Sequence, residues 1–271
     1  MTDIIVSSPK TSGLKAIKVR NWIHRIALAL AVLAPLVFMA AGLGAKFGLW
    51  SWQFGLGTLT RDVGMKMLTG SVIFGLLAIL ATIFVTPRKG WWIGLLALIV
   101  GIGGMAKGAA TQKKVAALPF IHDVSTDTQN PPVFTEVVLS ERAKVKGVNS
   151  LDYIGKKDSR DKTLVSVLQT SAYPDVRSLV KEESSDVVFG QALSAAKAMG
   201  WTIKAENVQA GTIEATAETF WYGFKDDVAI RIQPAEGGGS IVDVRSVSRV
   251  GGSDLGANAE RVKAYLTKLA Q

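Results

Sequence analysis

The sequence contains no cysteine and only two histidines, His24 and His122, among its 271 residues. Without cysteine, the chain has no thiol nucleophile, no disulfide and no thiolate metal ligand. A zinc site needs three or four clustered His, Cys or carboxylate ligands, and neither histidine has such neighbours at a suitable spacing. We therefore expect no bound metal, and the cysteine content says nothing about the redox compartment.

Glycine-rich phosphate-binding motifs and a serine nucleophile elbow are also missing. The run Gly237-Gly238-Gly239 lies between two predicted strands, so it indicates a hairpin turn and not a phosphate-binding loop. These absences exclude the common nucleotide-binding and α/β-hydrolase motifs, and we expect no cofactor.

Acidic residues are nearly absent from the first part of the chain. Residues 1–114 hold 13 Lys and Arg but only two acidic residues, whereas residues 115–271 hold 18 Lys and Arg and 20 Asp and Glu. The net charge of +9 therefore belongs to the first part, and the second part has a net charge of −2. Because this second part has no basic surface for a phosphate backbone, we expect no nucleic-acid partner.

Three long uncharged runs occupy the first part: residues 26–45, 67–87 and 90–106. A helix needs about 20 apolar residues to cross the bilayer core. We predict a membrane unit of residues 1–114 with three transmembrane helices, at about 24–45, 67–87 and 90–107. The first run begins too far into the chain and lacks the cleavage site of a signal peptide. Residues 47–56 carry Trp50, Trp52 and Phe54, and we predict that they lie at the membrane interface.

Basic residues outside these runs bear on orientation. Five Lys and Arg residues precede the first run, and Arg88 and Lys89 make the second loop basic. The positive-inside rule then places the amino terminus in the cytoplasm and, with three spans, the carboxy-terminal unit outside it. Lys107, Lys113 and Lys114 count against this orientation. Because no Asp, Glu, Lys or Arg lies within the runs, a transporter or pump is disfavoured, and membrane lipids are the expected partners.

Residues 115–271 show the alternation of half-buried antiparallel strands. Apolar Ile213, Ala215 and Ala217 alternate with Glu214 and Thr216. The same holds around residues 228–232 and 242–249, where the polar positions include Asp227, Arg231, Asp243, Arg245 and Arg249. The pattern predicts a sheet with one core face and one polar face. On the polar face, the Asp and Arg residues either pair in solvent or form buried pairs, and we expect at least one of Arg245 and Arg249 to be the buried partner of Asp227 or Asp243.

Two helices complete this unit. Apolar spacing predicts one at 185–199, ended by Gly200, and another that starts at Ser253-Asp254 with the buried stripe Leu255, Ala259, Val262, Leu266 and Leu269. Residues 118–134 are expected to form an extended arm, and residues 141–162 a solvated loop. The predicted fold is α+β, an antiparallel sheet of about four to five strands with two helices on one face, fused to the three-helix membrane unit.

Polar groups gather around the last two strands and the last helix: Asp227, Arg231, Asp243, Arg245, Arg249, Asp254, Asn258 and Arg261. Three interpretations are open. The groups form a structural network, or the arginines bind a carboxylate or phosphate bidentately, or paired carboxylates such as Asp226 and Asp227 act in catalysis. Adjacent strand residues point to opposite faces, which disfavours the last.

Two separated blocks carry a family resemblance. One is PFIHDVSTDTQNPP, residues 119–132, with the arm residues His122, Asp123, Thr126 and Asp127; the other comprises WYGFKDDVAIRI from residue 221 and DVRSVSRVGGSDLGANAER from residue 243. Over residues 118–269 the chain resembles domain-of-unknown-function family 1499, found in bacteria and plastids. The resemblance implies an α+β fold and a membrane setting, and the family has no settled biochemistry. We expect a multi-pass protein of the bacterial inner membrane with a periplasmic carboxy-terminal unit.

These observations favour a non-enzymatic, membrane-anchored envelope protein that binds a protein partner or a small anionic or lipid-like ligand. An acid–base hydrolase that uses Asp227 or Asp243 and a structural subunit of a membrane complex are the alternatives.

Overall fold

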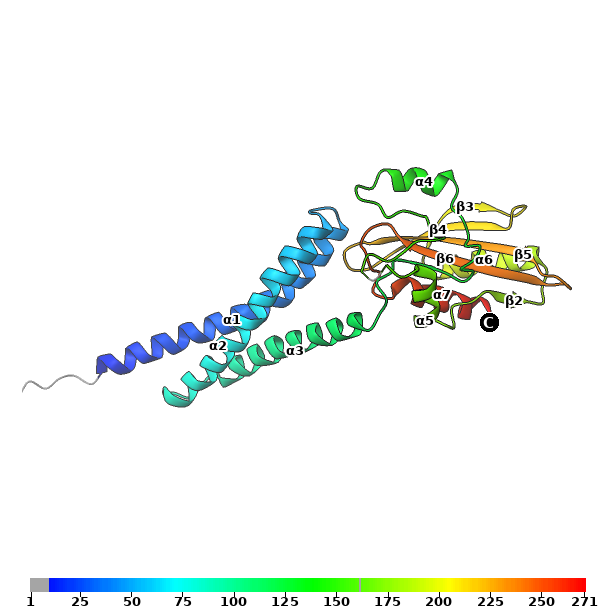
Figure 1. Cartoon of the computed structure of the whole chain (residues 1–271). Helices are drawn as coiled ribbons and strands as arrows, with labels where there is room; N and C mark the ends of the chain where they lie inside the picture. Colours follow the sequence, from blue (N-terminus) through cyan, green and yellow to red (C-terminus); the bar gives the residue numbers. More distant parts are fainter. Residues whose placement is uncertain (1–9, 161) are drawn as a thin grey trace, which may run out of the picture. The chain divides into compact units, whose positions relative to one another are not determined.

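The computed structural model describes residues 10–160 and 162–271. The chain forms two compact units, with Lys113 as the last residue of the first and Lys114 as the first of the second (Figure 1).

The first unit consists of long apolar helices: α1 (Lys10–Lys46), the π-helical η1 (Phe54–Gly64), α2 (Met65–Phe84) and α3 (Trp91–Ala116). Three helical stretches, residues 13–46, 54–84 and 91–116, are long and apolar enough to cross a membrane. The prediction of three apolar helices is thus confirmed, and it fits a membrane-associated protein. Helices α1 and α3 extend well beyond the predicted spans, because Lys, Gln and Ala favour helix outside the apolar run as well.

The interfacial position of residues 47–56 stays a prediction, but the segment is not separate from the helix that follows it. Residues 47–50 form a turn, but Phe54 already begins η1, which runs directly into α2. A hydropathy pattern shows where charged residues interrupt an apolar run. It does not show where a helix ends, because the helical backbone continues through Arg61 and Asp62.

Glycines allow α2 and α3 to approach closely. A Cβ atom on Gly94 would lie 2.7 Å from the carbonyl oxygen of Gly75, whereas one on Gly103 would meet nothing within 4 Å. Polar groups of α1 complete the unit. Arg20 donates hydrogen bonds to the carbonyls of Val85 and Pro87, just after α2, and His24 lies 3.0 Å from the Thr82 hydroxyl.

The second unit is built on a six-stranded antiparallel sheet in the order β1-β6-β5-β4-β3, with β2 also paired to β6. Its strands are β1 (Asp123–Ser125), β2 (Leu179–Lys181), β3 (Thr202–Asn207), β4 (Thr212–Glu218), β5 (Lys225–Pro234) and β6 (Ser240–Ser248). Its helices are α4 (Glu136–Ala143), α5 (Val165–Ala172), α6 (Ser185–Ala198) and α7 (Ala257–Leu269). The predicted α+β class is confirmed.

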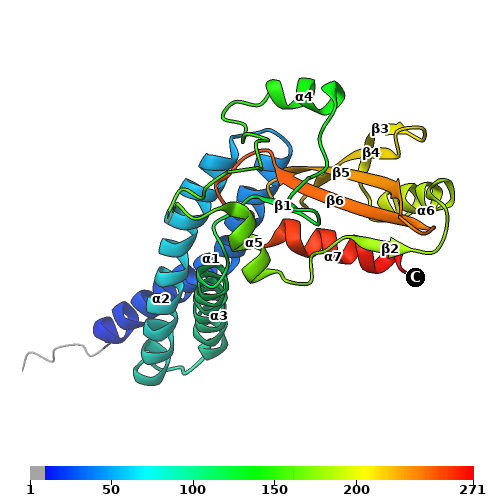
Figure 2. The same ribbon diagram turned by 45° about the vertical axis from the view of Figure 1, so that its right-hand side comes forward.

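Helices α6 and α7 pack on the apolar face of this sheet, and α4 lies on the opposite side (Figure 2). The main core joins strand residues such as Ile213, Val228 and Val244 to Val188 of α6 and Tyr265 of α7. Phe134, Val138, Leu151, Ala229 and Val247 form a smaller apolar cluster on the α4 side. Both faces of the sheet are therefore covered, so the Asp and Arg side chains of the polar face do not pair on an open solvent face.

Two further details differ from the sequence expectations. The region predicted as a solvated loop, residues 141–162, is partly buried: it contains the end of α4 and the buried side chains of Arg142, Tyr153 and Asp158. Helix α7 begins at Ala257 instead of Ser253, and Leu255 is half exposed with φ of 56°. The Asp254 carboxylate still accepts the N–H groups of Gly256 and Asn258, so it caps the helix from the preceding loop.

Candidate functional site

The Asp227 carboxylate is the centre of an ionic cluster on the α4 side of the sheet. This side chain is fully buried, and Arg142 of α4 donates to its Oδ2 at 2.7 Å. Arg249 donates to both carboxylate oxygens, and the Thr216 hydroxyl donates to Oδ1 at 2.9 Å. Two guanidinium groups and a hydroxyl thus saturate one carboxylate.

Glu141 forms the outer edge of this cluster. Its carboxylate accepts hydrogen bonds from Lys204 at 2.8 Å and from Arg249 at 2.9 Å. Hydrogen bonds from Lys204 and then Arg249 lower the pKa of Glu141 to about 2. The carboxylate is therefore ionised at neutral pH and shields the buried pair from water.

Arg245 makes a second buried pair, with Asp123 of β1. Its Nε and Nη2 bind the two carboxylate oxygens at 3.0 and 2.8 Å, and the remaining donors reach the carbonyls of Pro132 and Leu151. The guanidinium carbon lies 5.6 Å from the ring centroids of Phe134 and Tyr153. The sequence prediction grouped Arg245 with other strand residues, whereas its partner lies in the arm.

The other predicted residues form two smaller networks. On the α4 side, Asp243 accepts from Arg231 at 2.8 Å, from Thr126 at 3.0 Å and from Ser178 at 2.5 Å, and Arg231 also binds Asp127 at 3.0 Å.

On the helix side, Asn258 and Arg261 of α7 bind one another and the strand hydroxyl of Ser246, and Arg261 also binds Asp226 at 2.5 Å. Asp226 and Asp227 therefore lie on opposite faces of the sheet, which separates the two carboxylates that catalysis would need together.

Of the three interpretations of the cluster, these contacts favour the structural network. Asp227, Asp243, Arg245 and Arg249 are each at most 6% exposed. Their carboxylate oxygens and guanidinium donors are directed at one another or at protein carbonyls and hydroxyls. Groups arranged in this way stabilise and specify a packed interface, and they offer little to a ligand or a substrate.

Two of the predicted arm residues, His122 and Asp123, line an open hollow. The hollow has a volume of about 250 Å³ and is lined by Phe120, Ile121, His122, Asp123, Lys156, Lys157, Asp158, Ser159, Val165 and Gly252. The Lys156 ammonium donates to His122 Nε2 at 3.0 Å and to the Ser150 carbonyl at 3.1 Å, and both acceptors are uncharged groups. The contact of Lys156 with His122 was not predicted, because Lys156 lies in the region predicted as a solvated loop.

Two lysines, Lys156 and Lys157, and two aspartates, Asp123 and Asp158, line the hollow together with His122. Burial lowers the pKa of His122, and the positive charge of Lys156 lowers it further. A neutral imidazole with its proton on Nδ1 suits the geometry, since Nδ1 lies 3.3 Å from the Gly252 carbonyl. The carboxylate oxygens of Asp158 accept the backbone N–H groups of Arg160 and Thr163. Asp123 is bound to Arg245, so the carboxylates that line the hollow already have partners.

The hollow also has an apolar wall. The Phe120 ring lies against Gly252, where a Cβ atom would come within 2.7 Å of the ring. The guanidinium of Arg160 stands 4.0 Å from the ring centroid. An anion with a small apolar part would match this lining of cations, imidazole and ring.

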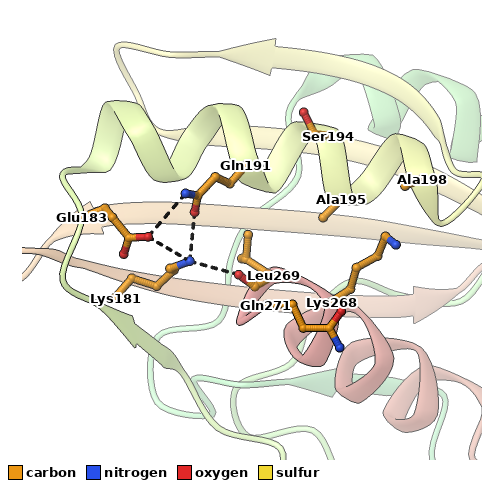
Figure 3. A pocket seen from close by; sticks show the side chains of 9 residues that line it. All are labelled: Lys181, Glu183, Gln191, Ser194, Ala195, Ala198, Lys268, Leu269 and Gln271. Atoms are coloured by element: carbon orange, nitrogen blue, oxygen red, sulfur yellow. Dashed lines mark hydrogen bonds and ion pairs between the residues drawn. The ribbon is translucent and has the colours of Figure 1, made fainter.

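A second, more open hollow of about 410 Å³ lies between β2, α6 and the end of α7 (Figure 3). Lys181 stands at its centre and donates to Gln191 at 2.9 Å and to the Leu269 carbonyl at 3.1 Å, with the Glu183 carboxylate at 3.3 Å (Figure 3). Because a carboxylate and two neutral acceptors satisfy this ammonium, the contacts mainly tie β2 to the two helices.

Among the residues that the structure describes, no group of three or more His, Cys, Asp or Glu side chains could hold a metal ion.

The fold and these networks define an α+β domain that follows three apolar helices. A family model described as a protein of unknown function, DUF1499, matches residues 123–269, and the chain belongs to this family. The resemblance stated from the two sequence blocks is thus confirmed. No curated protein matches the chain.

Proposed function

We propose that this protein is a membrane-anchored, non-enzymatic binding protein whose second unit holds a small anionic ligand in the hollow lined by His122 and Lys156. The observation that carries this proposal is an ammonium group whose hydrogen-bond partners are both neutral, beside an apolar ring, in an open hollow. A carboxylate or phosphate at this place would gain a charge-assisted hydrogen bond from Lys156. The buried Asp and Arg networks then serve as the rigid support of the arm that carries His122.

Binding of a small anion by the intact protein tests this proposal. Inorganic phosphate and octanoate, titrated separately into the detergent-solubilised protein and followed by calorimetry, should distinguish a requirement for charge alone from one for an apolar part. The Lys156→Gln variant should lose about tenfold or more in affinity, because charge-assisted hydrogen bonds contribute about 1.5–3 kcal/mol. Lys181→Gln, in the other hollow, is the matched control and should bind as the unaltered protein does.

The pH dependence of the same titration provides a second readout. Lys156, Asp123 and Arg142 are the charges that act on His122, and Lys156 is the nearest of the cations. Lys156 and Arg142 lower the pKa of His122, and Asp123 raises it. A bound anion opposes the effect of the two cations, so binding takes up a proton and affinity should rise as the pH falls below 6.5, the ordinary value for histidine. The rise should be absent in His122→Gln. Equal affinities of Lys156→Gln and the unaltered protein would refute the proposed site.

The proposal places the carboxy-terminal unit in the periplasm of a bacterial cell. Support comes from the basic amino-terminal segment, the basic loop at Arg88 and Lys89, and an odd number of apolar helices. An alkaline phosphatase reporter, which is active only outside the cytoplasm, should be active when fused after Gln271 and inactive when fused after Thr86. The reverse pattern of activities would put the unit in the cytoplasm and remove the envelope part of the proposal.

A further inference from the structure

The hairpin loop between β4 and β5 is unusually rich in aromatic residues. Residues 220–224 read Phe-Trp-Tyr-Gly-Phe. Phe220 is 66% exposed and Trp221 is 46% exposed, whereas Trp201 and Tyr265 of the same unit lie in the core. The two rings contact one another edge to face, with centroids 4.9 Å apart. Aromatic side chains gain about 25 cal/mol for each Å² of apolar surface removed from water, so the exposed parts of these rings favour an apolar environment.

The loop holds its rings in a fixed conformation. Thr219 and Phe224 close it by two hydrogen bonds of 2.9 Å, and the Thr219 hydroxyl donates to the Trp221 carbonyl at 2.7 Å. Tyr222 and Gly223 adopt positive φ values of 64° and 63°. A non-glycine residue is rarely found in this conformation, and such strain is tolerated mainly where a local structure must be preserved. The aromatic tip is therefore preorganised.

Strand register places this loop at the same end of the sheet as the arm that leads from α3. Asp226 of β5 pairs with Ser248 of β6, and Asp123 of β1 pairs with Val247. The His122 carbonyl accepts the Ser248 N–H. Since neighbouring strands lie about 4.8 Å apart, the arm at His122 and the start of β5 are separated by about two strand spacings.

The chain itself links this end of the sheet to a helix that is long enough to cross a membrane. Ala116 ends α3, and only six residues later the chain reaches His122. Six residues span at most about 21 Å when fully extended. The arm at this end of the sheet is thus joined to α3 by a short segment of chain.

Charge and residue type at this end also suit a membrane interface. Lys157 and Arg160 are exposed and flank the arm residues Phe120 and His122, while the exposed Lys225 lies opposite the exposed Glu218 in the strand register. Trp and Phe prefer the headgroup level of a bilayer, and exposed Lys and Arg attract anionic lipids.

We propose that the 220–224 loop inserts Phe220 and Trp221 into the headgroup region of the bilayer to which the protein is anchored. The loop would then fix the second unit against the membrane surface, with the end of the sheet that carries the arm facing the lipid. This inference does not depend on ligand binding in the His122 hollow.

Because the chain lacks cysteine, a single reporter can be placed without altering other residues. Trp221→Cys and, separately, Phe220→Cys are labelled with the environment-sensitive fluorophore NBD in the full-length protein. The labelled proteins are reconstituted in vesicles of phosphatidylethanolamine and phosphatidylglycerol that contain lipids spin-labelled near the headgroup. Val208→Cys is the matched control, since Val208 is also exposed and apolar but lies in the β3–β4 turn at the other end of the sheet.

We expect the lipid quencher to reduce the fluorescence at positions 220 and 221 about threefold or more relative to position 208, as interfacial insertion of aromatic positions requires. Protection of the same positions from iodide should accompany this quenching. Fluorescence at 220 and 221 that responds to lipid quencher no more than at 208 would overturn the proposal. Protection from iodide without lipid quenching would also overturn it, and would assign the loop to a protein contact. Two independent label positions guard against a local disturbance of the loop by either substitution.

Discussion

The Asp227→Asn variant is expected to lose about 3–5 kcal/mol of unfolding free energy in the second unit. Asparagine keeps the size of the side chain but removes the negative charge that Arg142 and Arg249 share, and its amide would present donors to two buried guanidinium groups. The cost arises because buried cations lose their partner and cannot regain water. The change is measured by urea unfolding of the intact protein in detergent, with protease cleavage within residues 114–271 as the readout of unfolding.

Lys204→Gln is the matched control for this experiment. Lys204 belongs to the same cluster through Glu141, but both side chains of this pair are partly exposed, at 22% and 32%. Ion pairs that water can reach contribute about 0–1 kcal/mol, so the control should unfold close to the unaltered protein. Equal stabilities of Asp227→Asn and Lys204→Gln would show that the buried cluster does not stabilise this fold.

Arg245→Gln is expected to cost a similar amount, about 3–5 kcal/mol. The change leaves the Asp123 carboxylate, 1% exposed, without its bidentate partner. It also frees the carbonyls of Pro132 and Leu151 and removes the planar group that lies near two aromatic rings. The arm should detach from β6 first, because Asp123 belongs to β1, so hydrogen exchange of the β1 amides should speed up before global unfolding.

A double-mutant cycle isolates the pair itself. Asp123→Asn combined with Arg245→Gln should cost clearly less than the sum of the two single changes, because each single change already removes the same interaction. Arg177→Gln is the control, since Arg177 is exposed and its Nε binds only the Pro174 carbonyl among the contacts that the structure describes. Strict additivity at positions 123 and 245 would contradict a direct ion pair.

The two faces of the sheet could be separated from the sequence, because side chains along a strand alternate with a period of two. This period correctly divided Ile213 and Val228 from Glu214 and Asp227. The glycine run at 237–239 and the left-handed Gly200 likewise followed from local conformational rules.

The cover of the polar face could not be predicted in the same way. Helix α4 has only eight residues, with Val138 and Arg142 as its buried side chains, and so few positions do not establish a helical period. The partner of Arg142 is Asp227, 85 residues further along the chain. Pairing at such a distance depends on tertiary structure, which a single sequence does not contain. The contact of Lys156 with His122, 34 residues apart in the sequence, could not be predicted for the same reason.

Leu255 illustrates a different limit. Its spacing from Ala259 suits a buried helical stripe, but the chain turns at Leu255 and Gly256, both with positive φ, before α7 begins. The Asp254 carboxylate accepts the N–H groups of Gly256 and Asn258, and the first helical residue lies later than the spacing predicts. Helix ends depend on the exact geometry of one or two residues, and periodicity averages over many.

Strand β6 has a further consequence for how copies of this protein can meet. It pairs with β5 along one side, and on the other side β1 and β2 cover its two ends. Thr126 fills the interval between them, with its N–H on the Val244 carbonyl and its hydroxyl accepting the Val244 N–H. At the opposite border of the sheet, β3 carries a bulge next to the charged Lys204.

Bulges, lysines and short covering strands prevent sheets from joining edge to edge. A membrane concentrates its proteins in two dimensions, where uncovered backbone would promote fibrous association. The covered strand β6 and the bulged border strand β3 should both disfavour the extension of one copy's sheet by another copy when the protein is concentrated in a bilayer.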